Sequence, residues 1–189
     1  PKVAADAAPY AETLFEASPL GRALEQGAAG AAWQPGTGHS ADYGYGTNKK
    51  TEALCWRVDG DGALRLDGEA FYRAGALEKT TTTDAEGRRR IEYKDHSGKT
   101  VLKRSELAVG AQDTVHTHWA CSYYVYDRHD RLRYVLPPMA VEGITSGVID
   151  ALEVGEAVLC TMDTTLTQAD DDNVYYYLPW GSVTLGEGF

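Results

Sequence analysis

The sequence is short of cysteine, of long apolar runs and of positive charge, and each shortage excludes a class of protein. Three cysteines in 189 residues are too few and too dispersed for a disulfide framework. We predict buried free thiols, with one disulfide and a leftover thiol as the alternative. No apolar run is long enough to cross a bilayer. The formal net charge of −10 disfavours nucleic acid as the main partner, because phosphate binding requires fields of lysine and arginine.

Signatures of catalysis are also missing. The sequence contains no Gly-x-Ser-x-Gly nucleophile elbow, no glycine-rich phosphate loop and no dinucleotide-binding fingerprint. We therefore predict a protein without enzymatic activity and without a cofactor. The first residue is Pro1 and no secretion signal precedes it, so we expect a processed product or a segment of something larger.

Glycine and aromatic residues, by contrast, are plentiful. Twenty glycines, twelve tyrosines and four tryptophans favour β structure. Runs of alternating polar and apolar residues are separated by turn signals, of which Asp59-Gly60-Asp61-Gly62 is typical of a hairpin. The sequence predicts an all-β fold of antiparallel hairpins that form a sheet or a sandwich. At most one short helix is expected, near residues 147–154, with Ser146 as its cap.

One short sequence motif occurs three times, at residues 83–88, 93–99 and 126–132. Each copy has an aromatic residue or threonine, an aspartate, polar residues and then a basic residue before an apolar run. We predict hairpin turns in which the aspartate accepts backbone N–H bonds, the glycine adopts a positive φ and the tyrosine packs on the sheet. The basic residue is predicted to pair with an acidic residue across the strands. The residues given these structural roles are Asp84, Gly87, Tyr93, Asp95, Gly98, Tyr126 and Asp127.

The three copies resemble the tyrosine-aspartate (YD) repeats of bacterial RHS-repeat proteins, and most closely the poorly characterised domain on their N-terminal side. The resemblance is carried by Phe15–Arg22, Gln26–Gly30, Trp33, Gly75–Asp84, Glu92–Asp95, Tyr123–Asp127 and Leu132–Pro138, which together span about three quarters of the chain. It implies a β-hairpin protein that is secreted or exposed on a cell surface and has a structural role. The third copy has Asp130 where this family usually has glycine, and aspartate tolerates left-handed geometry better than most residues.

The chain is expected to divide into a lead-in segment (1–9), a β-rich domain with the YD-like repeats (10–138) and a divergent C-terminal segment (139–189). The last segment is expected to pack on the sheet or to extend it. Exposed strand edges invite pairing with the remainder of a larger repeat protein or with a second copy. A glycan or a protein ligand is a further candidate partner.

Two groups of residues raise the alternative of metal binding. His116 and His118 are spaced as two ligands on one face of a strand predicted at 116–126, and they suggest a small metal-dependent hydrolase. Asp170 and Asp172 supply oxygen ligands of the kind that Ca²⁺ prefers. Neither group comes with the further ligands of a complete site, so surface or hydrogen-bonded (satisfied) histidines and a solvated acidic turn are the favoured interpretations.

Aromatic runs raise a third alternative, a carbohydrate-binding β-sandwich. Alternation along a strand turns half of each run outward, where aromatic rings can hold a sugar or a partner. The candidates are Trp119, Tyr124, Tyr176 and Trp180. Cys121 is disfavoured as a nucleophile, because alternation points it to the face opposite both histidines. The main prediction is a structural or binding module without catalysis.

Overall fold

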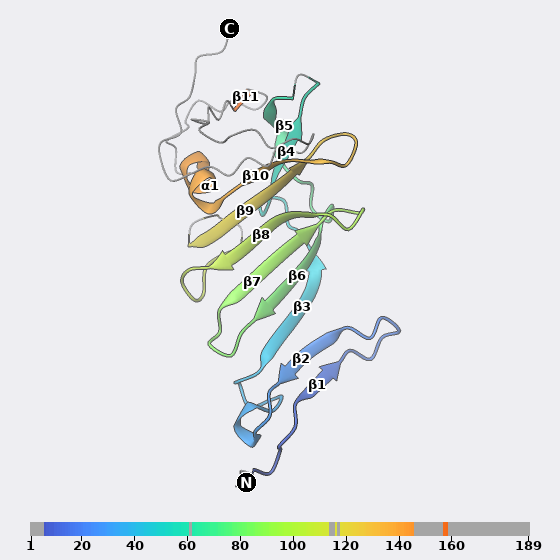
Figure 1. The fold of residues 1–189 in the computed structure, drawn as a ribbon, viewed down its shortest axis with the longest axis vertical. Coiled ribbons are helices and arrows are strands. Elements are labelled where there is room, and N and C mark those ends of the chain that lie inside the picture. The colour runs from blue at the N-terminus through green and yellow to red at the C-terminus, as the bar shows by residue number, and fades with distance from the viewer. Residues whose placement is uncertain (1–5, 61, 114–115, 117, 146–156, 159–189) are drawn as a thin grey trace, which may run out of the picture.

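The computed structural model describes residues 6–60, 62–113, 116, 118–145 and 157–158. Its main feature is an antiparallel sheet of eight strands in the order β1-β2-β3-β6-β7-β8-β9-β10 (Figure 1). These strands are β1 (Glu12–Phe15), β2 (Ala23–Gly27), β3 (Ala41–Thr47), β6 (Glu78–Thr83), β7 (Arg89–Lys94), β8 (Thr100–Glu106), β9 (Trp119–Tyr126) and β10 (Leu132–Leu136). Neighbouring strands are consecutive in the sequence except at one point, where β3 pairs with β6.

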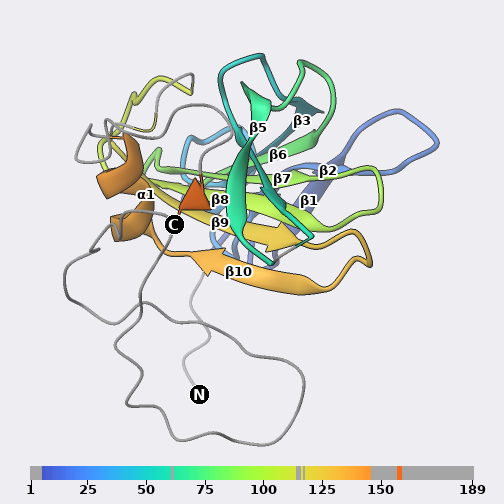
Figure 2. The ribbon, with the colours of Figure 1, turned by 90° about the horizontal axis from the view of Figure 1, so that it is seen from above.

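The chain between β3 and β6 leaves the large sheet and forms part of a smaller one. The strands of this second sheet are β4 (Leu54–Val58), β5 (Leu64–Phe71) and β11 (Ala157–Val158), in the order β11-β5-β4. The β4–β5 hairpin lies against one face of the large sheet, near β9 (Figure 2). The all-β prediction is confirmed, and the hairpin predicted at 59–62 is present, with Gly62 N donating to Asp59 O at 3.0 Å.

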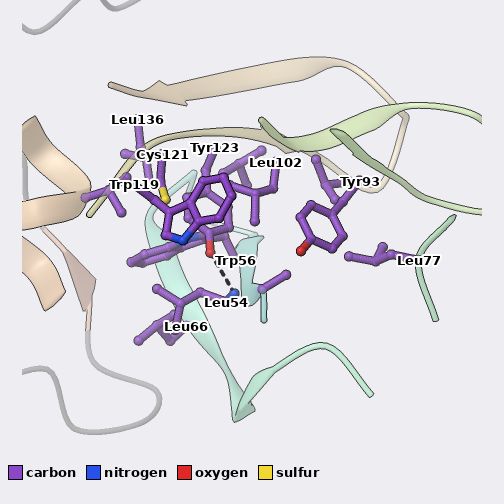
Figure 3. Close-up of a cluster of buried hydrophobic side chains, with 14 of the residues drawn as sticks. Leu54, Trp56, Leu66, Leu77, Tyr93, Leu102, Trp119, Cys121, Tyr123 and Leu136 are labelled. Carbon is purple, nitrogen blue, oxygen red and sulfur yellow. Dashed lines mark hydrogen bonds between the residues drawn. The ribbon is translucent and has the colours of Figure 1, made fainter. Parts of the chain in front are cut away.

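The core lies between the two sheets (Figure 3). Side chains on β9 alternate between buried and half-buried, as expected of a strand with one face on a core. Tyr123 is central to it, because its hydroxyl accepts a hydrogen bond from Leu54 N at 2.9 Å and its ring meets Trp56 edge-on at 6.3 Å. The buried hydrophobic residues are Ala53, Leu54, Trp56, Leu64, Leu66, Leu77, Ile91, Tyr93, Val101, Leu102, Trp119, Cys121, Tyr123, Val125, Leu136 and Val141.

The two cysteines among the described residues are free, as the sequence predicts, but only one of them is fully buried. Cys121 is buried in the core, and burial raises the pKa of its thiol. Cys55 is a half-buried free thiol, and burial raises its pKa to about 11. Cys160 lies outside the described residues. No helix among the residues described has the length and apolarity needed to cross a membrane.

Several element boundaries differ from the sequence prediction. Strand β9 begins at Trp119 and not at His116, because His118 takes a φ of 67° and ends the extended conformation there. The sequence pattern also misses β2. A helix, α1 (Pro138–Thr145), follows β10 after the predicted proline stop, and proline suits the first turn of a helix because its missing N–H would be unpaired there. The helix predicted at 147–154 lies outside the described residues.

The three repeat turns share one hydrogen-bonding scheme. In each turn the amide of the fourth residue donates to the aspartate carbonyl, and the aspartate amide donates to the carbonyl four residues on, all at 2.9 Å. The aspartate Oδ1 accepts two more backbone N–H bonds, of 2.8–3.1 Å. The fourth residue takes a positive φ, which is 79° in Gly87, 80° in Gly98 and 66° in Asp130. This is the turn geometry that the sequence pattern predicts for the three aspartates.

The tyrosines and basic residues of the repeats behave less uniformly. Tyr126 is adjacent to its aspartate, is half-buried and donates to a backbone carbonyl of β8 at 3.2 Å. Tyr93 stands two residues before its aspartate, so it lies on the other face of the sheet, fully buried, with its hydroxyl 3.2 Å from Glu52. Arg131 pairs with the aspartate of its own turn, which differs from the cross-strand pairing predicted, whereas Lys99 pairs both with Asp95 of its own turn at 3.6 Å and with Asp130 of the β9–β10 turn at 2.7 Å.

Gly98→Val is expected to lower the free energy of unfolding by about 1–2 kcal/mol, because a β-branched residue is strained at positive φ. A Cβ at Gly98 would meet no atom within 4 Å, so the loss is conformational and not steric. Gly98→Asp is the matched control and is expected to cost less, since Asp130 already occupies the equivalent position. Urea unfolding measures both variants, and equal losses would contradict this assignment.

Candidate functional site

Exposed apolar side chains gather at the β1 end of the large sheet. Six of the nine large hydrophobic residues exposed in the described chain precede residue 34. The six are Tyr10, Leu14, Phe15, Leu20, Leu24 and Trp33. The second sheet lies at the opposite end of the large sheet, so it does not cover β1 and β2 (Figure 1). A concentration of exposed apolar residues is typical of an interaction surface.

The loop between β1 and β2 is fixed by one carboxylate. Glu16 accepts hydrogen bonds from Arg22 on both oxygens, each at 2.8 Å, and from the Ser18 hydroxyl at 2.6 Å. Gly21 closes the turn at a φ of 57° and donates to Ser18 O at 3.1 Å. The hydrogen bonds from Arg22, with that from Ser18, lower the pKa of Glu16 to about 2. The carboxylate is therefore ionised at neutral pH and links the two ends of the loop through Ser18 and Arg22.

This ordered loop presents apolar side chains to water. Leu20, in the turn, is 71% exposed, and Phe15, at the end of β1, is 62% exposed. The Arg22 guanidinium lies 4.4 Å from the centroid of the Tyr45 ring and so ties the loop to β3. A preorganised loop loses little conformational entropy when it binds. The β1–β2 hairpin (residues 12–27) is therefore the candidate interaction site.

Strand β1 also offers a free backbone edge. Within the described residues it pairs only with β2, so the N–H and C=O groups of its outer side have no strand partner. Glu12–Phe15 contains neither lysine nor proline, which natural edge strands often carry to prevent pairing, and its protection is limited to a length of four residues, the charge of Glu12 and a register shift at Leu14/Phe15. The edge of β1 can therefore accept a further strand by β-augmentation.

A second cluster, absent from the sequence predictions, is a network of charged side chains on the core face. Lys79 Nζ lies 3.1 Å from Glu52 Oε1 and 2.8 Å from Asp113 Oδ2. Arg89 bridges Asp113 at 2.8 Å and Glu106 at 2.9 Å, and its hydrogen bonds lower the pKa of Glu106 to about 2. The two cations offset most of the charge of the three carboxylates and hold the segments before β4 and after β8 against the sheet. The network has a structural role and offers no unpaired reactive group.

The structure separates the two histidines that the sequence pairs as metal ligands. The His116 ring stacks on Tyr123 at 6.0 Å, and its Nε2 lies 2.7 Å from the Tyr123 hydroxyl. His118 is exposed. His116 therefore lies on the core face of β9 together with Cys121, which corrects the prediction of opposite faces, because neither histidine belongs to the strand. No group of three His, Cys, Asp or Glu side chains in the described part of the chain could hold a metal ion.

His116 is expected to make folding pH-dependent. Burial, with a contribution from the Arg104 charge, lowers its pKa from 6.5 to about 4. The unfolded chain therefore binds a proton that the folded chain does not, and stability falls as pH drops below 6.5 until about 4. The expected loss from this residue between pH 7 and pH 5 is about 2 kcal/mol.

Urea unfolding at a series of pH values measures the effect of His116. In the His116→Gln variant the pH dependence over this interval is expected to be smaller by that amount. The matched control is His118→Gln, which removes an exposed histidine and is expected to keep the wild-type slope. Equal slopes in all three proteins would contradict a buried neutral imidazole.

Of the aromatic and acidic residues predicted as binding candidates, the structure describes Trp119 and Tyr124. Trp119 is not an exposed platform, because it is 5% exposed and its indole N–H donates to Gln112 O at 3.0 Å. Tyr124 is half-buried on the other face of β9, with the Lys103 ammonium 5.9 Å from its ring centroid. Asp170, Asp172, Tyr176 and Trp180 lie outside the described residues.

Comparison with known proteins identifies a domain at the start of the chain. Residues 1–47 match a family described as "Domain of unknown function (DUF6443)". The match ends with β3, so it contains the β1–β2 hairpin and does not contain the three repeat turns. The prediction of an uncharacterised domain is thus confirmed for this part of the chain. No curated protein and no solved structure matches the chain.

Proposed function

We propose that this chain is a non-enzymatic structural module of a secreted or cell-surface protein of the RHS type. In this proposal the β1–β2 hairpin binds a further β-hairpin of the same larger protein, which pairs with the edge of β1. The observation that carries the proposal is the combination of a free strand edge with exposed apolar side chains on one ordered hairpin. The resemblance of residues 83–132 to YD repeats supports the extracellular setting.

The repeated turn supports a role in building extended β structure. Three hairpins with the same aspartate turn join β6 to β7, β7 to β8 and β9 to β10, and each turn is specified by local residues alone. A chain built this way can be lengthened by adding hairpins at an edge without altering the existing strands. The sheet ends at β1 in the described residues, and β1 is the strand next to the exposed apolar residues.

The net charge favours another part of the same protein, and not a second copy of this chain, as the partner of β1. Two copies would each carry a formal net charge of −10 and would repel one another. A covalently connected hairpin is present at high effective concentration, so a short edge suffices to hold it.

Photo-cross-linking in the natural polypeptide tests this proposal. The photoreactive residue p-benzoylphenylalanine replaces Phe15, whose aromatic ring is exposed, and cross-linked peptides are identified by mass spectrometry. The expected product joins residue 15 to a β-hairpin segment of the same polypeptide. The same probe in place of Val109, an exposed apolar residue outside the hairpin, is the control and is expected to give no such product.

Two results of the cross-linking experiment would contradict the proposal. A product that joins residue 15 to residue 15 of a second copy would show that β1 pairs with another copy of this chain and not with a hairpin of the larger protein. The absence of any product, or the same product from both probe positions, would remove the β1–β2 hairpin as an interaction site.

A further inference from the structure

A pocket of about 280 Å³ lies between two hairpin turns, the one that joins β4 to β5 and the one that joins β9 to β10. The turns come from different sheets and are close together in Figure 2. The Tyr134 hydroxyl donates to the carbonyl of Gly62 and so links β10 to the β4–β5 turn. Val58 is the single apolar side chain in the lining of this pocket; charged and polar residues and glycine make up the rest.

The lining is rich in positive charge, although the chain as a whole is acidic. Arg128, Arg131 and Arg133 all line the pocket, and all three are exposed. Arg128 Nε lies 3.2 Å from a ring nitrogen of His129, which also lines the pocket. Arg133 has no acidic partner among the described residues. Three arginines on one small concave surface are unusual in a chain with a formal net charge of −10.

The two aspartates of the lining are already engaged by other groups. Asp127 Oδ1 accepts backbone N–H bonds in its turn, and its Oδ2 lies 2.9 Å from Arg131 Nε. Asp59 forms an ion pair with Arg57 at 3.4 Å and a closer one with Arg65. Because these carboxylates have partners of their own, the guanidinium groups of Arg128 and Arg133 are available to an anion from solution.

We propose that this pocket binds an acidic sugar through its carboxylate or phosphate group. Guanidinium groups recognise both oxyanions by charge-assisted, often bidentate hydrogen bonds. The volume is near the lower end of small-molecule pockets, roughly 300–1,000 Å³, and is suited to a single sugar unit. A lining that is almost wholly polar matches a hydroxyl-rich ligand better than an apolar one.

This site is independent of the proposed hairpin interaction. It lies at the β10 end of the large sheet, whereas the β1–β2 hairpin lies at the opposite end (Figure 1). Its ligand also differs in kind, because an acidic sugar is recognised by arginines and a β-hairpin by a strand edge. Failure of one proposal therefore leaves the other unchanged.

Isothermal titration of the 189-residue protein with small probes tests the proposal. The probes are D-glucuronate for the carboxylate, glucose 6-phosphate for the phosphate, and glucose as the neutral control. At low salt we expect at least one acidic probe to bind with a Kd of about 1 mM and glucose not to bind. Added salt is expected to weaken binding, because exposed charges are screened.

Variants locate the binding. Arg133→Gln, alone or with Arg128→Gln, is expected to weaken binding of the acidic probe about fivefold or more. The matched control is Arg90→Gln, which removes an exposed arginine of β7 outside the pocket and is expected to leave the affinity unchanged. Comparison of the two acidic probes shows whether carboxylate or phosphate is preferred. No binding by either acid, equal binding of glucose, or equal affinities in the Arg133 and Arg90 variants would overturn the proposal.

Discussion

Lys79→Met is expected to lower the free energy of unfolding by about 3–5 kcal/mol. Glu52 is fully buried, and Lys79 lies 3.1 Å from it. Methionine fills the space of the lysine stem but leaves the Glu52 carboxylate buried without that positive charge. Breaking a buried pair on one side costs far more than the pair contributes as a whole, because the remaining charge is desolvated without compensation.

Chemical denaturation of four proteins tests this expectation. They are the wild type, Lys79→Met, Glu52→Gln and the double variant, and the double variant is expected to be more stable than the sum of the two single losses predicts. Lys103→Met is the matched control, since Lys103 is 55% exposed and pairs with Glu92 at 3.5 Å. Its expected loss is below about 1 kcal/mol. Similar losses for Lys79→Met and Lys103→Met would contradict a buried network.

Trp119→Ala is expected to cost about 3–5 kcal/mol, because it empties a large buried volume. The variant also removes the contact of this indole with two guanidinium groups, those of Arg89 at 5.0 Å and Arg104 at 4.7 Å from its ring. Trp119→Phe keeps much of the volume and is expected to lose clearly less. Urea unfolding followed by circular dichroism measures both without relying on tryptophan fluorescence.

Tyr124→Ala is the control for position on β9. Tyr124 lies on the other face of the same strand and is half-buried, so its removal is expected to cost less than half of what Trp119→Ala costs. Equal losses for the two variants would contradict the assignment of faces. If Trp119→Ala were as stable as the wild type, Trp119 would be an exposed aromatic residue and again a candidate for ligand binding.

The repeat turns could be predicted from the sequence because their structure is set by adjacent residues. An aspartate that caps its own turn and a residue with positive φ three positions later act over four residues, and Asp127 and Asp130 show both roles. The same locality explains why β6, β7 and β8 are neighbours and why β9 and β10 are neighbours, but not why β8 pairs with β9. It also explains why Tyr93 is in the core: it is one residue further from its aspartate than Tyr126 is, and successive side chains of a strand point to opposite faces.

Contacts between distant segments could not be predicted in this way. The environment of Tyr123 depends on Leu54 and Trp56 of the β4–β5 hairpin, which comes from a different part of the chain. The alternation of side chains along β7 does indicate the charged network, because Arg89 lies on the same face of the strand as Ile91 and Tyr93. A charge at a core-facing position suggests a buried partner, but the partner Asp113 lies in a loop without any pattern.

Hydrogen exchange of the β1 amides is the most direct test of the central claim, that the edge of β1 receives another strand. The measurement compares residues 1–189 alone with the natural polypeptide, and uses the amides of β7 as an internal standard. We expect β1 amides to exchange rapidly in the isolated chain and to be protected in the natural polypeptide, while β7 is protected in both. Equal exchange of β1 in the two proteins would contradict the proposed strand addition.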